Sequence, residues 1–180
     1  MPDFLNVEDV LSHLDLKEHM LGAEFGCGSA VFTISLAKRL NKGRVYALDI
    51  QQEKLSALSG RAVLEKVNNI SMVLCDLEAP KGSTLRDSYL DVVLIPNVLF
   101  QAENKHAMIE EGARVLKPGG QLLIIDWLKE NAFSPKDLPA GEAGGMVKPE
   151  EIKAITQKLG LQMKKEFAVG DYHYALLFTK

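Results

Sequence analysis

The stretch Glu24-Phe25-Gly26-Cys27-Gly28-Ser29-Ala30 decides the fold of this chain. An apolar run precedes it and an amphipathic helical pattern follows it, so the sequence predicts a strand, a glycine-rich turn and a helix. Gly26 and Gly28 carry no Cβ atom, which lets a ligand approach the backbone, and the free N–H groups of the helix face the turn. Glu24 ends the strand, and its carboxylate suits a cationic ligand better than a pyrophosphate, which it would repel.

Four further apolar strands are predicted, and each ends in a polar or acidic residue. They are residues 44–49, ending in Asp49; 70–75, followed by Asp76; 90–95, followed by Pro96-Asn97; and 121–125, followed by Asp126. Asp49 lies 21 residues after Gly28, and adenosine-binding folds place an acid about 20 residues on to hold the ribose hydroxyls. Open parallel sheets bind ligands at the carboxyl ends of their strands, so we predict the site at that edge.

Five segments together carry a family resemblance. They are EFGCGSA at 24–30, VYALDI at 45–50, VLCDLE at 73–78, DVVLIPNVL at 91–99 and RVLKPGGQLLIIDW at 114–127. In this order and at these spacings, the chain resembles the class I S-adenosylmethionine-dependent methyltransferases over residues 20–127. A helix that ends in Leu-Lys-Pro-Gly-Gly before an apolar strand is typical of this family more than of dehydrogenases.

The resemblance implies a site for the cofactor S-adenosyl-L-methionine. By position in the family's motifs, the cofactor residues would be Glu24, Gly26, Cys27 and Gly28 around the methionine part, Asp49 at the ribose, Ile50, Asp76 and Leu77 at the adenine, and Asn97 at the cofactor or substrate. The chain departs from the family at Ala30, where a third glycine is common. Alanine is small enough for cofactor binding to be kept.

Strands that alternate with helices predict right-handed βαβ units and a parallel sheet. Helices are expected over 6–19, 29–40, 52–67, 102–116 and 149–160. Two last strands, 161–169 and 172–179, flank Gly170-Asp171, a hairpin signal. The family has the same ending. We therefore expect an α/β fold, a Rossmann-like three-layer sandwich whose mostly parallel seven-stranded sheet has the order 3-2-1-4-5-7-6 and ends in an antiparallel C-terminal hairpin.

A length of 180 residues predicts one domain, 1–180, with an N-terminal helix within 1–19 and a lid loop at 129–148. The lid is expected because that segment is rich in glycine and proline and follows the fifth strand. The N-terminal helix has an apolar stripe that needs a partner. We expect it to dock near the carboxyl ends of the first and fourth strands, beside Glu24 and Asn97.

Composition excludes several classes of function. The net charge of −3 does not suit a nucleic-acid binder, and no apolar run is long enough to span a membrane. The N-terminus shows no signal-peptide pattern, and two cysteines make no disulfide framework, so a cytoplasmic protein is expected. No cluster of His, Cys and Asp has metal-ligand spacing, so we predict no metal.

The catalytic residue is not readable from the sequence, because a sulfonium methyl group needs an aligned nucleophile more than a base. The candidates are Asn97, His106, near the start of a helix at the ligand edge, and Trp127, which follows Asp126. His173 lies on the opposite strand face from its two tyrosine neighbours, and we do not count it among them. The segment 96–100 lacks the Asn/Asp-Pro-Pro-aromatic motif, which argues against an amide or nucleobase nitrogen acceptor.

Several functions stay open at this stage. The first is methyl transfer to a small molecule, and the second is methylation of a protein in an open groove. A cofactor-binding regulatory subunit without turnover is the third, which the intact cofactor residues disfavour. A nicotinamide-dependent oxidoreductase is disfavoured by Glu24 and by Val31, where a third glycine would be expected. The acceptor atom and the oligomeric state are left open.

Overall fold

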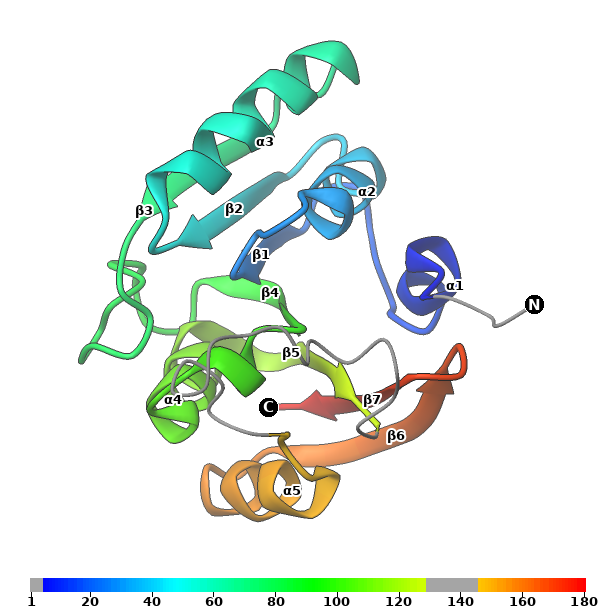
Figure 1. Cartoon of the computed structure of the whole chain (residues 1–180), viewed down its shortest axis with the longest axis vertical. Coiled ribbons are helices and arrows are strands. Elements are labelled where there is room, and N and C mark those ends of the chain that lie inside the picture. The colour runs from blue at the N-terminus through cyan, green and yellow to red at the C-terminus, as the bar shows by residue number, and fades with distance from the viewer. Residues whose placement is uncertain (1–4, 129–145) are drawn as a thin grey trace.

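Seven strands form one sheet in the order β3-β2-β1-β4-β5-β7-β6 (Figure 1). The computed structural model describes residues 5–128 and 146–180. The strands are β1 (Leu21–Phe25), β2 (Arg44–Asp49), β3 (Ile70–Leu74), β4 (Leu90–Pro96), β5 (Leu116–Trp127), β6 (Gln162–Val169) and β7 (His173–Thr179). The first five are parallel, and β7 is antiparallel to both β5 and β6. The predicted class, strand order and C-terminal hairpin are confirmed.

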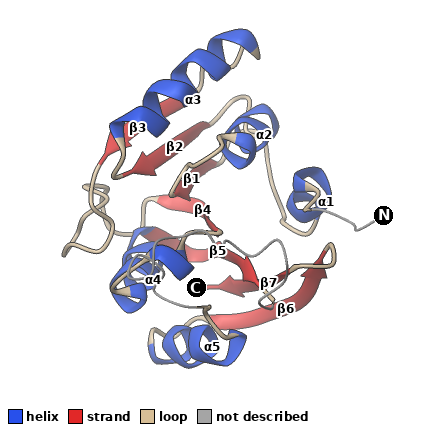
Figure 2. Cartoon of the chain, in the orientation of Figure 1, coloured by secondary structure: helices blue, strands red, loops and turns tan. Residues whose placement is uncertain are grey.

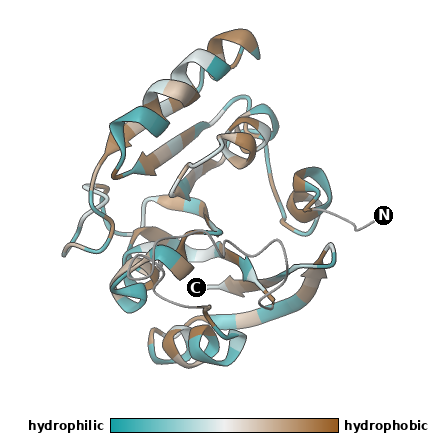
Figure 3. Ribbon diagram, in the orientation of Figure 1, coloured by the Kyte–Doolittle hydropathy of each residue, from teal (hydrophilic) through white to brown (hydrophobic). Residues whose placement is uncertain are grey.

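Helices cover both faces of the sheet, which makes the predicted three layers (Figure 2). They are α1 (Val7–Ser12), α2 (Val31–Arg39), α3 (Gln52–Leu64), η1 (Leu99–Gln101, a 3₁₀ helix), α4 (Lys105–Val115) and α5 (Pro149–Lys158). The first three pack on one face and the last two on the other. Most helices show both hydrophobic and hydrophilic residues in Figure 3, as helices with one face on a sheet should.

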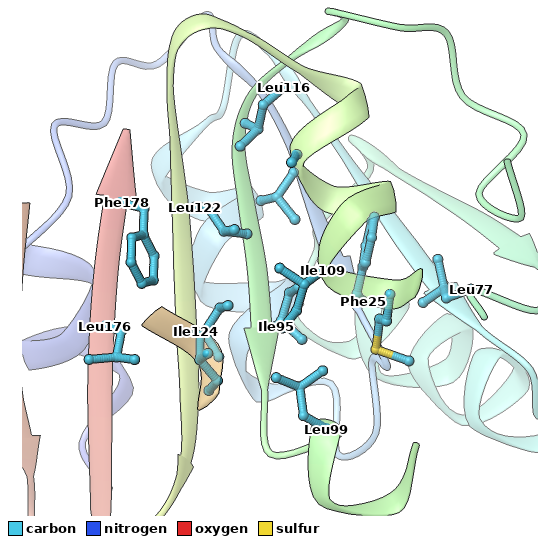
Figure 4. Close-up of a cluster of buried hydrophobic side chains, with 14 of the residues drawn as sticks. Phe25, Leu77, Ile95, Leu99, Ile109, Leu116, Leu122, Ile124, Leu176 and Phe178 are labelled. Carbon is cyan, nitrogen blue, oxygen red and sulfur yellow. The ribbon is translucent and has the colours of Figure 1, made fainter. Parts of the chain in front are cut away.

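The core is densest between α4 and the centre of the sheet. There Phe25 of β1, Ile95 of β4, Ile109 of α4 and Phe178 of β7 are all buried in one cluster (Figure 4). On the opposite face, the stripe of α1 packs among the buried residues of α2, β4 and β5. Because this stripe has found its partner, α1 is fixed against the sheet despite its length of only 6 residues.

The helix predicted over 6–19 is wrong in its length, since α1 ends at Ser12. Its start is as expected: the side chain of Asn6 accepts hydrogen bonds from the N–H groups of Glu8 and Asp9 at 3.0 and 3.2 Å. The Ser12 hydroxyl donates to the carbonyl of Asp9 and competes with the helix. The backbone of Asp15 then exchanges two hydrogen bonds of 3.0 Å with the Gln121 side chain, which draws the chain back to the sheet.

The fourth helix begins later than the predicted 102–116. Asn104 is its N-cap and accepts a hydrogen bond from the N–H group of Ala107 at 3.0 Å. The 3₁₀ helix η1 ends at Gln101, and residues 102–104 join it to α4. The predicted ends of α2 and α3 also extend two or three residues beyond the observed helices. Such shifts at helix ends leave the sheet and the helix order unchanged.

The two edges of the sheet differ. No helix follows β3, because residues 75–89, all of them described, cross to β4 in turns. On β3 the side chain of Leu74 is 56% exposed. The other edge strand, β6, carries Lys164 and Lys165, charges that discourage pairing with another strand.

The predicted lid, 129–148, falls largely on residues 129–145, which lie outside the described part of the chain. Its last residues are described. Val147 is buried, and its carbonyl accepts a hydrogen bond of 2.6 Å from the hydroxyl of Tyr174 on β7. This bond joins the start of α5 to the sheet.

Candidate functional site

A cavity of about 610 Å³ opens at the carboxyl ends of the central strands. The nine predicted cofactor residues, Glu24, Gly26, Cys27, Gly28, Asp49, Ile50, Asp76, Leu77 and Asn97, all line it. They come from four strand ends that are far apart in sequence but adjacent in the sheet. The volume lies in the range of small-molecule and cofactor sites, about 300–1,000 Å³.

The turn between β1 and α2 needs its glycines. Gly26 has a φ of +75°, and a Cβ atom there would lie 2.7 Å from a methyl carbon of Val98. Ala30 also has a left-handed backbone, with a φ of +66°, immediately before α2. The third glycine of the family would adopt that conformation without strain. The alanine keeps the same path at a small conformational cost.

Glu24 is buried at the end of β1, and one oxygen of its carboxyl group accepts a hydrogen bond from the Thr33 hydroxyl. Burial raises the pKa of Glu24 to about 8, against the opposing effect of the hydrogen bonds from Thr33. The carboxyl group therefore takes up or releases a proton near neutral pH, and a nearby cation would favour its ionised form.

Asp49 joins the end of β2 to the glycine turn. Its carboxylate accepts hydrogen bonds from the N–H groups of Gln51 at 2.9 Å and Gly28 at 3.4 Å. The Cys27 thiol lies 3.7 Å from the same carboxylate. Burial, followed by the charge of Asp49, raises the pKa of Cys27 to about 12, so this thiol stays protonated and unreactive.

The cavity is acidic. Four carboxyl groups line it, those of Glu24, Asp49, Asp76 and Glu78, and Lys54 is the one lysine or arginine among the described residues that line it. Such a wall attracts a cationic ligand and disfavours a pyrophosphate. The charge expected from Glu24 alone is thus reinforced by the rest of the site.

Of the three catalytic candidates, only Asn97 lines the cavity. It has a φ of +51°, and its side-chain oxygen is buried without a hydrogen-bond partner among the described residues. His106 is half exposed and lies 3.7 Å from Glu110, one turn along α4. Trp127 lies outside the cavity lining and packs against His173. The structure therefore places Asn97 in the cavity wall and leaves His106 and Trp127 outside the cavity lining.

One residue of the site was not predicted from the sequence. Thr33, one turn into α2, was not singled out, although a hydroxyl nine residues after a buried acid is a usable signal. Leu5 and Val7 bring the beginning of α1 to the cavity, where Glu24 and Asn97 also lie. The expected docking of the N-terminal helix at this edge is therefore right for its first turn.

Comparisons with known proteins agree with this geometry. A family model described as Methyltransferase domain matches residues 23–124, more than half of the chain. The chain belongs to the class I S-adenosylmethionine-dependent methyltransferase family. A solved structure, a SAM dependent methyltransferase from Aquifex aeolicus, superposes on this methyltransferase with a TM-score of 0.81. The two are 26% identical, and the match covers 97% of this chain and 89% of the other.

Two curated relatives match part of the chain. The Ubiquinone/menaquinone biosynthesis C-methyltransferase UbiE of Hydrogenovibrio crunogenus is 35% identical over 104 residues, 57% of this methyltransferase and 40% of the relative. The Demethylmenaquinone methyltransferase of Geobacillus stearothermophilus is 23% identical over 136 residues, 73% of this chain and 55% of the relative. The chain thus spans about half the length of these two relatives or less.

No described helix of this methyltransferase is long and apolar enough to cross a membrane. Within residues 5–128 and 146–180, no three His, Cys, Asp or Glu side chains are grouped as a metal site.

Proposed function

We propose that this protein transfers a methyl group from S-adenosylmethionine to a small-molecule acceptor. The observation that carries the proposal is the acidic cavity of about 610 Å³ at the carboxyl edge, with Glu24 buried behind the glycine turn. The cofactor of this family carries an ammonium and a sulfonium cation. A wall with four carboxyl groups and one lysine among its described residues complements that charge.

Different residues of the cavity wall would contact different parts of such a cofactor. Glu24 and the turn at Gly26 and Gly28 would hold the methionine part, and Asp49 would accept hydrogen bonds from the ribose. Ile50 is 65% exposed beside the cavity, and an adenine ring would cover it. The bound cofactor supplies an electrophilic methyl group, and the protein aligns the acceptor and excludes water.

The activities for which the relatives are named support an acceptor of the quinone-precursor class. These rings are small and planar, so they need no separate substrate domain. Asn97 lies at the boundary between the cofactor cavity and the end of β5, because its N–H group donates to the carbonyl of Ile125 at 2.8 Å. We infer that it contacts the acceptor or the reacting part of the cofactor.

Calorimetry tests the cofactor part of the proposal. We expect saturable binding of S-adenosylmethionine and S-adenosylhomocysteine and none of NAD. Saturable NAD binding without S-adenosylhomocysteine binding would overturn the proposal.

The acceptor is tested by transfer of a radiolabelled methyl group. Reduced naphthoquinones and benzoquinones without the ring methyl group should become labelled, and a mixture of unfolded proteins should not. Asp49→Ala serves as the control for cofactor-dependent labelling. Label found in protein but in no small molecule would shift the assignment to a protein methyltransferase.

A further inference from the structure

Five buried side-chain nitrogen and oxygen atoms have no hydrogen-bond partner within the described part of the chain, and all five lie at one edge of the sheet. They belong to Asn97, Asp126, Trp127 and His173. These residues follow or end β4 and β5 or begin β7, three strands that are neighbours in the sheet. Buried polar atoms are nearly always paired in folded proteins. A group of such atoms at the ligand edge is a candidate surface for ligand contact.

Two of the four residues form a defined pair. Trp127 lies directly opposite His173 in the antiparallel pairing of β5 with β7, and their ring centroids are 4.2 Å apart at an interplanar angle of 38°. The next residue, Leu128, donates a hydrogen bond of 2.8 Å to the carbonyl of Tyr172, which fixes the end of the ladder. The Trp127–His173 pair is therefore held by backbone pairing on both sides.

His173 is 5% exposed, and neither of its ring nitrogens has a hydrogen-bond partner among the described residues. Burial lowers its pKa. Its cross-strand neighbours, Trp127 and Val169, do not ionise, and the strand pleat directs Asp126 and Tyr174 to the other face. The imidazole is therefore neutral at neutral pH, and one ring nitrogen can accept a hydrogen bond from a ligand's hydroxyl group. An anion formed beside the ring would favour the protonated imidazolium and oppose the effect of burial.

We propose that the Trp127–His173 pair binds the methyl acceptor, that His173 takes its proton, and that the acceptor is an aromatic compound with an ionisable hydroxyl group. The indole ring of Trp127, which packs against the imidazole of His173, offers an aromatic face to an aromatic ligand. The indole N–H group of Trp127 has no acceptor within the described residues and can donate to the ligand's oxygen. This inference rests on the proposed function.

The proton step balances without a further reactant. The hydroxyl proton of the acceptor passes to the free nitrogen of His173, and the electron pair stays on the oxygen and spreads into the aromatic ring. That charge makes the oxygen and the ring carbons beside it better nucleophiles for the methyl group. After transfer to the oxygen, the imidazolium returns its proton to water. After transfer to a ring carbon, that carbon releases its hydrogen as a proton to water, the imidazolium returns its own proton to the oxygen, and the ring becomes aromatic again. His106, which is half exposed beside Glu110, is not placed for this role.

The test uses para-nitrophenol, whose neutral and ionised forms absorb at different wavelengths, and the full chain saturated with S-adenosylhomocysteine. Trp127 is the single tryptophan of the sequence, so its fluorescence reports binding at the pair. At a pH below the solution pKa of the probe, we expect saturable quenching of Trp127. We also expect an increase of the nitrophenolate band with the same concentration dependence.

Two variants separate proton transfer from binding. His173→Gln keeps a hydrogen-bonding group, and we expect it to bind the probe without the nitrophenolate band. His173→Phe removes both nitrogens, and we expect it to lose the band and to weaken binding by roughly tenfold. His106→Gln is the matched control and should behave like the unchanged protein. A melting curve confirms that each variant is folded.

Absence of saturable quenching, or an equal nitrophenolate band in His173→Gln and the unchanged protein, would overturn the inference. Calorimetry with S-adenosylhomocysteine distinguishes this failure from failure of the proposed function. If that ligand binds while para-nitrophenol does not, only the assignment of the Trp127–His173 pair is lost. If S-adenosylhomocysteine itself does not bind, the proposed function fails first.

Discussion

Cofactor binding should release a proton from Glu24, and the amount follows from the pKa of that carboxyl group. Burial raises this pKa to about 8. At neutral pH, roughly nine tenths of the ligand-free molecules therefore carry the proton. The ammonium group of a bound S-adenosylhomocysteine favours the ionised carboxylate. Binding at neutral pH should thus release up to roughly 0.9 proton per molecule.

Because binding releases a proton from Glu24, the direction in which the affinity for S-adenosylhomocysteine changes with pH is known. Ionising a group one pH unit below its pKa costs about 1.4 kcal/mol, which corresponds to about tenfold in affinity. Because binding releases a proton, affinity rises as the pH rises. The logarithm of the association constant should increase by about one per pH unit below a pH of about 8 and level off above it.

Glu24→Gln is the perturbation that removes the ionisable group and keeps its shape. Calorimetry in two buffers with different ionisation enthalpies measures the proton release directly. The unchanged protein should give different binding heats in the two buffers, and Glu24→Gln should give equal ones. Glu78→Gln removes another carboxyl group from the cavity wall and should keep the release. Equal heats in both buffers for the unchanged protein, with a flat pH profile, would refute the reasoning.

Further predictions concern stability and the ribose contact. In the folded protein, burial raises the pKa of Glu24 from 4.5 to about 8. The free energy of unfolding should therefore fall as the pH rises from about 4.5 to about 8, and melting curves of Glu24→Gln should show a smaller fall. Asp49→Ala should weaken S-adenosylhomocysteine binding by about 1–3 kcal/mol in calorimetry, and unchanged affinity would exclude it as the ribose residue. Gly26→Ala should destabilise the fold, because its Cβ would lie 2.7 Å from a valine methyl; an unchanged denaturant midpoint would contradict this. Arg114→Met should lower the free energy of unfolding in denaturant by about 3 kcal/mol, because it leaves the buried Glu111 carboxylate without its arginine partner. Arg114→Lys keeps a cation and should lower it less.

The fold could be predicted because the sequence patterns that indicate its strands are local and recur along the chain. Each strand of the parallel part is an apolar run that ends in a polar residue, and the family's strand order supplied the topology. The residues predicted to hold the cofactor line one cavity for the same reason, since Glu24, Asp49 and Asp76 end or follow strands at one edge. Helix ends were predicted less well. The early end of α1 depends on Gln121, which is more than a hundred residues away.

The Trp127–His173 pair shows what local patterns leave out. Strand alternation placed His173 correctly on a face but gave no reason to connect it with Trp127, 46 residues earlier in the sequence. Their contact depends on the register between β5 and β7, which is set by tertiary pairing. His106 was the opposite case, because its position near a helix start looked suitable while its side chain turned to Glu110.

The exposed edge strand β3 affects where local unfolding of the sheet begins. A strand that pairs on one side only, with a half-exposed Leu74 and no helix after it, has few contacts to lose. Its amide hydrogens should therefore exchange with solvent before those of β1 and β4. Asp76 and Leu77, which line the cavity, follow this strand within three residues. A ligand that binds Asp76 and Leu77 would also order β3. Part of its binding free energy would therefore be offset by the conformational entropy that β3 loses.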